Sequence, residues 1–248
     1  MKVATLTGVI NPEDVSITKG VGGIYLKTTY DLMGLLTTDD PLLTVWIERG
    51  NGNNQYSCTN IPLKIFAHMS VFGGASMWKT VEGGVTYFHA VCEITQGGAV
   101  ALEPNDTIKL RLANLDPDDT FIICGMEDPD DIQEILAYDQ KTVLTDDVSR
   151  NLRVANYGLM AITGALGMSE IRMTLENGRI VSMTPDELRA TQVDNDPVLL
   201  VQNGVAGHVF HPSIIVVPIV GVAEIEVIKS NLDPVYIYLQ TEKSTSPQ

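Results

Sequence analysis

The chain has 248 residues, of which 44% are hydrophobic and 19% are charged, with a mean hydropathy of +0.10. This composition is that of a packed globular protein, large enough for one big domain or two smaller ones, and it excludes extended disorder. Lysine and arginine number 16 against 31 aspartates and glutamates, so the formal net charge is −15, which argues against a surface that binds nucleic-acid phosphates.

Short segments rich in β-branched and aromatic residues alternate with glycine and proline along the whole chain, which predicts an all-β protein. In the first half we expect strands at Ile24–Tyr30, Leu43–Glu48, Leu63–Met69, Val85–Ile94, Thr107–Leu112 and Thr120–Cys124. In the second half we expect them at Ile171–Leu175, Val198–Gln202, Ser213–Val217, Ala223–Lys229 and Val235–Gln240. Ile225 and Val227 alternate with glutamates, which is typical of a half-buried antiparallel strand.

Two short helices are predicted between the strands. Pro129–Tyr138 begins with a proline and acids that suit a first helical turn, and Ile132, Ile135 and Leu136 follow at helical spacing. The second helix spans Thr184–Arg189, where Thr184 and Glu187 have the spacing of a capping box. The apolar run Ile214–Ala223 is about half of the length that a membrane-spanning helix requires, and it predicts a pair of buried strands.

The N-terminal sequence MKVATLTGVI lacks the basic start and the uninterrupted apolar run of a signal peptide, so no export signal is expected. The three cysteines, Cys58, Cys92 and Cys124, are an odd number without CxxC spacing, which fits neither a disulfide framework nor a zinc site. We therefore expect reduced, mostly buried thiols and synthesis in the cytoplasm.

Four pairs of short segments recur in the same order, each second copy about 120 residues after the first. The pairs are Tyr30–Met33 with Tyr157–Met160, Ile47–Gly50 with Leu175–Gly178, Pro62 with Pro185, and Asn114–Pro117 with Asn231–Pro234. Duplication of one β unit explains this order, whereas the alternative is that Asx-Pro turns recur in any β protein.

Each unit has the size of an eight-stranded jelly roll, so the preferred fold is all-β with two tandem jelly rolls and a short helix near mid-chain. We expect a first jelly roll with an N-terminal arm over residues 1–127 and a linker with the helix over 128–150. The second jelly roll, with a C-terminal tail, then covers residues 151–248.

The sequence contains no recognisable arrangement of catalytic residues. His208 and His211 form an HxxH pair, but positions i and i+3 of a strand face opposite sides, so the two side chains could not both line one barrel without a bulge. His68 and His89 are isolated, and no GxSxG, HExxH or phosphate-binding glycine loop is present. We therefore predict no catalytic, cofactor-binding or metal-binding residue and no enzymatic activity.

Acidic clusters occur in several predicted turns. They are Asp116–Asp119, Asp128–Asp131, Asp39–Asp40, Asp146–Asp147 and Asp194–Asp196. Oxygen-rich loops of this kind can bind calcium, but none has the twelve-residue pattern with its glycine and terminal glutamate. Solvated turns are expected, and calcium at a subunit boundary stays open as an alternative.

The chain resembles the double jelly-roll major capsid proteins of tailless icosahedral bacteriophages that contain an internal membrane. The resemblance covers nearly the whole chain through the paired Tyr-x-Leu-Met and Asn-Leu-Asp-Pro segments, two jelly-roll-sized units, a short helix between them and the absence of a catalytic signature. This family has no diagnostic motif readable from one sequence, so no site residue is carried over.

The resemblance implies a coat protein that forms pseudo-hexagonal homotrimers, which tile an icosahedral shell in the virion. It implies contacts with penton and minor capsid proteins and with the internal viral membrane, and no direct contact with nucleic acid. Met1–Lys19 and Thr241–Gln248 are candidate arms that become ordered on assembly.

Two other classes of protein use similar architectures. A two-domain cupin-like metal enzyme predicts a bound transition metal beside His208 or His211 and a carboxylate. A jelly-roll carbohydrate-binding or adhesion module predicts exposed aromatic residues on one sheet face, which two tryptophans, Trp46 and Trp78, and an aromatic content of 6% do not favour.

Overall fold

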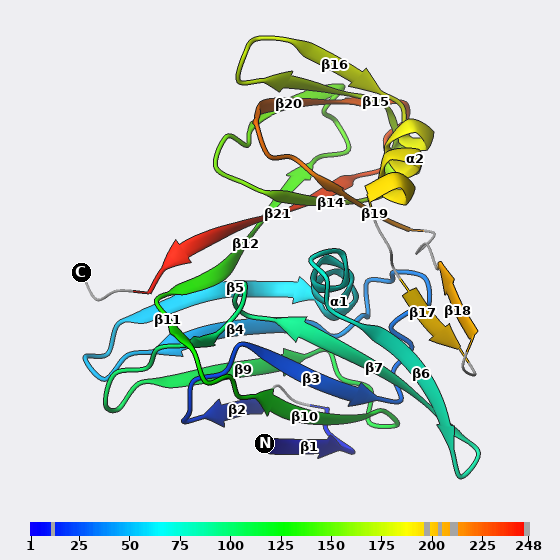
Figure 1. Cartoon of the computed structure of the whole chain (residues 1–248). Coiled ribbons are helices and arrows are strands. Elements are labelled where there is room, and N and C mark those ends of the chain that lie inside the picture. Colours follow the sequence, from blue (N-terminus) through cyan, green and yellow to red (C-terminus); the bar gives the residue numbers. More distant parts are fainter. Residues whose placement is uncertain (11–12, 196–198, 203–204, 209–212, 246–248) are drawn as a thin grey trace. The chain divides into compact units, whose positions relative to one another are not determined.

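The computed structural model describes residues 1–10, 13–195, 199–202, 205–208 and 213–245. The chain divides into two compact units, and each is described by itself (Figure 1). Unit 1 comprises Met1–Ala137, Val198–Val209 and Glu242–Gln248, and unit 2 comprises Tyr138–Pro197 and Phe210–Thr241. The prediction of an all-β chain is confirmed, and the boundaries expected at residues 127 and 150 stay a prediction.

Unit 1 contains two sheets whose strands follow the jelly-roll order. In chain order the eight strands are β1 (Lys2–Thr7), β2 (Glu13–Ile17), β3 (Gly23–Thr28), β4 (Leu42–Glu48), β5 (Asn54–Pro62), β7 (Val85–Glu93), β9 (Thr107–Ala113) and β10 (Thr120–Met126). One sheet has the order β1-β10-β3-β7 and the other β2-β9-β4-β5. The first strand thus pairs with the last, the second with the seventh, the third with the sixth and the fourth with the fifth, as in a long hairpin rolled into a sandwich.

Additional strands extend this unit. β6 (Met77–Glu82) pairs with β7, and the hairpin β17 (Leu199–Gln202) and β18 (Val205–His208) continues the same sheet beyond β6. β8 (Ala99–Val100) pairs in parallel with β11 (Asp131–Ile132). The whole sheet is therefore seven-stranded, in the order β1-β10-β3-β7-β6-β17-β18.

The strands of unit 2 repeat the same order. They are β12 (Glu134–Val143), β13 (Ser149–Arg153), β14 (Leu159–Thr163), β15 (Met168–Leu175), β16 (Ile180–Met183), β19 (Ile214–Pro218), β20 (Val222–Lys229) and β21 (Val235–Ser244). The sheets are β12-β21-β14-β19 and β13-β20-β15-β16, so the pairing of first with last through fourth with fifth recurs. The apolar run from residue 214 forms the predicted strand pair, as β19 and the start of β20.

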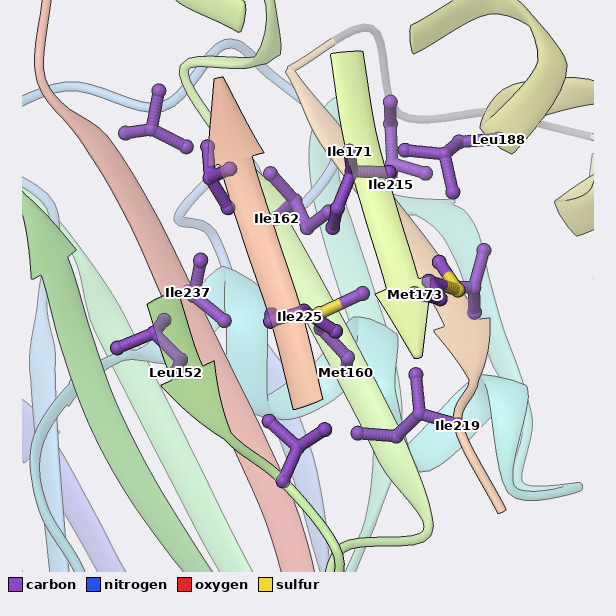
Figure 2. Close-up of a cluster of buried hydrophobic side chains, with 14 of the residues drawn as sticks. Leu152, Met160, Ile162, Ile171, Met173, Leu188, Ile215, Ile219, Ile225 and Ile237 are labelled. Atoms are coloured by element: carbon purple, nitrogen blue, oxygen red, sulfur yellow. The ribbon is translucent and has the colours of Figure 1, made fainter. Parts of the chain in front are cut away.

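A buried cluster fills the space between the two sheets of unit 2 (Figure 2). Ile225 and Val227 on β20 are fully buried, whereas Glu224 is exposed and Glu226 half-exposed, which confirms the predicted alternation. Ile162 and Ile237, from the opposite sheet, point into the same cluster. Leu188 joins the cluster from the helix that follows β16.

That helix, α2 (Pro185–Asn195), confirms the sequence-based prediction and begins as predicted. The Oγ1 of Thr184 accepts a hydrogen bond from the backbone N–H of Glu187 at 3.3 Å. The Oε2 of Glu187 accepts one from the N–H of Thr184 at 2.7 Å, which completes the capping box. No described helix is long and apolar enough to cross a membrane.

Two predictions of secondary structure are wrong. The strand expected at Leu63–Met69 is helix α1 (Leu63–Phe72), which is buried on nearly every side. Because a helix buried all round has no polar face, its apolar residues show no helical period. The helix expected at Pro129–Tyr138 is instead β11 and the first half of β12. Ile135–Tyr138 are all buried, which removes the alternation by which a strand is recognised, and β12 is paired with the distant β21.

The expected N-terminal arm also forms regular structure. β1 pairs with β10 and β2 with β9, so residues 1–19 supply the first two strands of the jelly roll. Thr241–Ser244 extend β21, and residues 246–248 of the expected tail lie outside the described residues.

Three of the four repeated segment pairs occupy equivalent positions in the two units. Ile47–Gly50 and Leu175–Gly178 each end the fourth strand, and Asn114–Pro117 and Asn231–Pro234 each join the seventh strand to the eighth. Pro62 and Pro185 each stand at the start of the helix that follows the fifth strand. The fourth pair is not equivalent, because Tyr30–Met33 follows the third strand whereas Tyr157–Met160 runs into it.

Candidate functional site

The structure does not bring the histidines together as a described metal site. His68 lies in α1 and His89 on β7. His208 ends β18, whereas His211 lies outside the described residues. Among the described side chains, no group of three or more His, Cys, Asp or Glu residues could hold a metal ion.

His89 is buried in a hydrogen-bonded aromatic cluster. Its Nδ1 lies 2.7 Å from the hydroxyl of Tyr25, and its Nε2 lies 2.7 Å from the Oγ1 of Thr80. Its ring stacks on Trp78, with centroids 5.0 Å apart and planes at 7°. Burial lowers the pKa of His89, and the charge of Lys27 acts in the same direction, so the ring is held neutral. Because both nitrogens are bonded, the ring connects β3, β7 and β6 and offers no free base.

A buried ion pair anchors the loop between β3 and β4 to α1. The Nζ of Lys64 donates to Asp40 Oδ1 at 3.0 Å and to the carbonyl oxygen of Leu35 at 2.7 Å. Asp40 also accepts hydrogen bonds from the Tyr30 hydroxyl at 2.6 Å and from the backbone N–H and Oγ1 of Thr37. Burial alone would raise the pKa of Asp40, but these donors outweigh it and lower the pKa. The hydrogen bonds of Asp40 and Lys64 hold the β3–β4 loop against α1.

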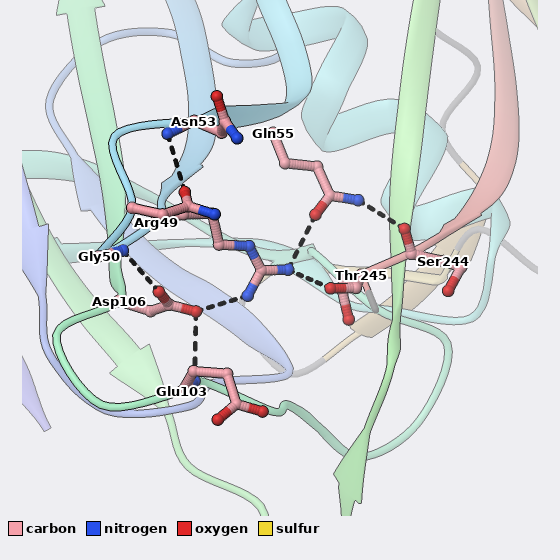
Figure 3. Close-up of polar contacts among 9 residues, drawn as sticks. Arg49, Gly50, Asn53, Gln55, Glu103, Asp106, Ser244 and Thr245 are labelled. Atoms are coloured by element: carbon pink, nitrogen blue, oxygen red, sulfur yellow. Dashed lines mark hydrogen bonds and ion pairs between the residues drawn. The ribbon is translucent and has the colours of Figure 1, made fainter. Parts of the chain in front are cut away.

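A second polar cluster, the C-terminal clasp, consists of Arg49, Gln55, Asp106, Ser244 and Thr245 within unit 1 (Figure 3). The guanidinium of Arg49 donates to Asp106 Oδ2 at 2.5 Å, to Gln55 Oε1 at 2.9 Å and to the carbonyl oxygen of Thr245. Gln55 in turn donates to the carbonyl oxygen of Ser244 at 2.6 Å. The clasp therefore fixes the end of β21 to the β4–β5 hairpin.

Asp106 is the charged partner of the clasp. Its carboxylate also accepts the backbone N–H of Gly50 at 2.9 Å and of Glu103 at 3.2 Å. Burial acts to raise the pKa of Asp106, but these two N–H groups and Arg49 lower it below its usual value. These neighbours keep the carboxylate of Asp106 ionised, and their hydrogen bonds use both of its oxygens.

All three cysteines are free thiols, as predicted. Cys58 and Cys92 are buried, and burial raises the pKa of each thiol to about 12. Cys124 is half-exposed on β10. A thiol with a raised pKa is a poor nucleophile, so Cys58 and Cys92 are not candidates for covalent catalysis.

In the acidic turns, several aspartate carboxylates accept hydrogen bonds from backbone N–H groups of the same turn. Asp116 accepts the N–H of Asp118 at 2.9 Å, and Asp128 accepts the N–H of Asp130 at 3.0 Å. Asp147 accepts the N–H of Leu144 at 3.0 Å. The contacts of Asp116 and Asp128 are the Asx turns expected of solvated acidic loops, whereas Asp147 closes its loop by accepting the N–H three residues before it. Calcium binding stays a prediction to be tested.

Each tryptophan packs against a neighbouring aromatic ring. Trp46 is only 7% exposed, packed between Tyr56 at a ring distance of 6.0 Å and the guanidinium of Arg111 at 5.5 Å. Trp78 stacks on both Tyr25 and His89 and is itself half-exposed.

Lys64, Arg49 and His89 each have a central place in a polar network, although sequence patterns assign none of them a role. Lys64 carries a signal, since it is the one cation in the apolar stretch LKIFAHMSVF and a buried ammonium requires a partner. The two networks and the His89 cluster use their charged groups to fix loops and strands.

The chain matches the crystal structure of the major capsid protein P2 from bacteriophage PM2. The match covers 100% of this chain and 96% of that chain, with a TM-score of 0.50 and 12% sequence identity, which shows a shared fold. No protein-family model and no curated protein matches the sequence. A match to the group B streptococcus pilus 2b backbone protein has a TM-score of 0.17 at 11% identity, covering 100% of this chain and 83% of that chain, and carries no weight.

Proposed function

We propose that this chain is a major capsid protein of the double jelly-roll type, from a tailless bacteriophage with an internal membrane. The observation that carries the proposal is the tandem arrangement of two units with the same jelly-roll strand order. The shared fold with a phage capsid protein, over 100% of this chain, supports it.

Tandem jelly rolls suit a homotrimer that tiles a shell. Three copies of a chain with two similar units present six similar units around a threefold axis, so the trimer is pseudo-hexagonal and can tile an icosahedral lattice. The equivalent positions of three repeated segment pairs support duplication of one ancestral unit. The chain would then reside in the virion after synthesis in the host cytoplasm.

The partners follow from the same assignment. Other copies of the chain form the trimer and the contacts between trimers, and penton and minor capsid proteins complete the shell. The net charge of −15 disfavours direct packing of nucleic acid, so the inner surface would meet a membrane and minor proteins.

The proposal excludes an enzymatic role, and two rival assignments remain testable. A cupin-like enzyme requires a metal near His208 or His211, whose side chains lie outside the described ones, so the metal assay tests it. A carbohydrate-binding module requires open aromatic rings on one sheet face: Trp46 is 7% exposed, whereas Trp78 is half-exposed, so sugar binding stays a rival to be tested.

The test is the native mass of the purified chain by light scattering, with a metal assay on the same sample. A mass of three chains or of shell-sized particles, without stoichiometric metal, supports the capsid assignment. A monomer or dimer that carries about one metal ion per chain overturns it in favour of the enzyme.

A further inference from the structure

The two outer sheet surfaces of unit 1 differ in chemistry. On the sheet β2-β9-β4-β5, Arg111 donates two hydrogen bonds to the carboxylate of Asp14, at 2.6 and 2.9 Å. On the same surface Lys109 pairs with Glu48 at 3.4 Å and donates to Ser16 at 2.9 Å. Alternating ion pairs and hydroxyls are typical of a sheet surface that faces water.

The other sheet carries an apolar outer surface, which we call the aromatic face. Its members come from four neighbouring strands: Ile122 and Cys124 on β10, Tyr25 on β3, Tyr87 and Val91 on β7, and Trp78 on β6. All six are half-exposed, whereas their chain neighbours Ile24, Ile123 and Cys92 are buried in the core. Since successive strand residues point to opposite faces, the six point outward.

The strand register places these side chains beside one another on neighbouring strands. Tyr25 is opposite Cys124 on one side and Val91 on the other. The rings of Tyr25 and Trp78 are stacked at 6.0 Å, and the His89 ring that stacks against both is held by two hydrogen bonds. The face is therefore ordered before any partner binds, which reduces the entropy lost on binding.

Lys27 and Glu82 lie on this side of the sheet and neutralise one another, and Glu93 on β7 is half-exposed, with its pKa raised by burial. Lys27 donates to Glu82 at 2.6 Å, and its ammonium lies 4.3 Å from the centroid of the Tyr87 ring. Depletion of unpaired charge and enrichment of tyrosine and tryptophan are the features of the buried centre of a protein interface. The aromatic face has this composition, whereas the charged sheet of the same unit combines Trp46 and Tyr56 with two ion pairs.

We propose that the aromatic face is a contact surface between copies of this chain. The inference rests on the proposed function, because it identifies a surface through which the coat protein self-associates. Each copy has a net charge of −15, so two copies repel one another wherever acidic surfaces meet. The aromatic face carries few acids, so two copies can approach there at a low electrostatic cost.

The size of the face fits the centre of such an interface. Three gaps of about 4.8 Å between four strands, over six residues of about 3.3 Å each, give a footprint of roughly 300 Å². A stable protein contact buries about 800 Å² on each partner. The aromatic face therefore supplies the apolar centre, and surrounding polar residues supply the rim.

The reactivity of Cys124 with a thiol reagent tests this contact in the wild-type protein. The other two thiols are buried and have a pKa of about 12, so a thiol reagent such as dithionitrobenzoate reacts first at Cys124. Dissociated subunits and assembled particles are separated by size and labelled in parallel. We expect one fast-reacting thiol per dissociated chain and at least tenfold slower labelling in the assembly.

A pair of matched variants tests the same claim through affinity. Tyr87→Ala removes a ring from the aromatic face, and Tyr56→Ala removes a 47%-exposed ring from the charged sheet of the same unit. We expect the first to raise the concentration for half-association at least tenfold and the second to change it less than threefold. Circular dichroism establishes that both variants are folded.

The outcomes separate the inference from the function on which it rests. If wild-type protein assembles while Cys124 stays as reactive as in free subunits, the aromatic face is not the contact and the inference fails, although the capsid function stands. Equal effects of the two tyrosine variants on association would likewise exclude the aromatic face as the contact. If wild-type protein stays monomeric at every concentration, the proposed function itself is overturned.

Discussion

Replacing Asp40 by alanine removes the carboxylate that ties the β3–β4 loop to α1. The carboxylate accepts hydrogen bonds from Tyr30, Thr37 and Lys64, and both Asp40 and Lys64 are only 3% exposed. The substitution leaves the Lys64 ammonium buried without its counter-charge. Breaking a buried pair in this way costs about 3–5 kcal/mol, so we expect Asp40→Ala to destabilise unit 1 by about 4 kcal/mol.

Urea unfolding followed by tryptophan fluorescence measures this loss. Trp46 and Trp78 are the only tryptophans and both lie in unit 1, so the signal reports on that unit. The double variant Asp40→Ala with Lys64→Met should recover at least half of the loss, because no uncompensated charge remains. A loss under about 1 kcal/mol in the single variant, or no recovery in the double variant, would show that the buried pair does not stabilise the loop in this way.

The same pair predicts a pH dependence. The pKa of Asp40 is lowered in the folded protein, so its contribution is fully present above the unfolded value of about 3.9 and is lost as pH falls through the folded value. The stability difference between wild type and Asp40→Ala should be constant from about pH 7 to 5 and shrink below about pH 4. A stability difference that stays constant down to about pH 2 would contradict a lowered pKa of Asp40 in the folded protein.

Three further predictions concern other elements. Thr184→Ala removes the cap of α2 and should cost about 1 kcal/mol, seen as faster amide exchange at Glu187; unchanged exchange would contradict it. Arg49→Met opens the clasp, so carboxypeptidase should trim the chain past Thr245 faster than in wild type, and equal rates would show that the clasp does not hold the tail. A chelator should leave the melting temperature unchanged, whereas a clear drop would assign calcium to the acidic loops.

Strands with one buried face are the most predictable elements of this chain. The alternation around Ile225 and Val227 is visible in the sequence, and the structure places both in the core. The alternation of Val15 and Ile17 with polar residues carries the same signal, and both are buried, although this stretch lies in the predicted N-terminal arm. The all-β prediction therefore rests on local signals that the sheets preserve.

Helices and strands that are buried on several sides are difficult to distinguish from the sequence. α1 has core contacts around its circumference, and β12 is buried through Ile135–Tyr138, so neither shows the period of its own structure. Long-range pairing decides the second case, because β12 lies beside β21 from the other end of the chain. Such pairing is not encoded in a local window of sequence.

The polar networks could not be predicted because their members are distant in sequence. Tyr25 contacts His89 because the β3–β7 register brings them together, and Arg49 contacts Thr245 across a separation of 196 residues. The aromatic face is not visible in the sequence, because its members come from four separate strands.

Electron microscopy of the purified chain, at rising concentration and salt, is the most direct test of a coat-forming function. Such a function predicts three-lobed or hexagonal particles of three chains that assemble into sheets or closed icosahedral shells. Isolated two-lobed particles of a single chain, unchanged at every concentration and salt, would contradict it.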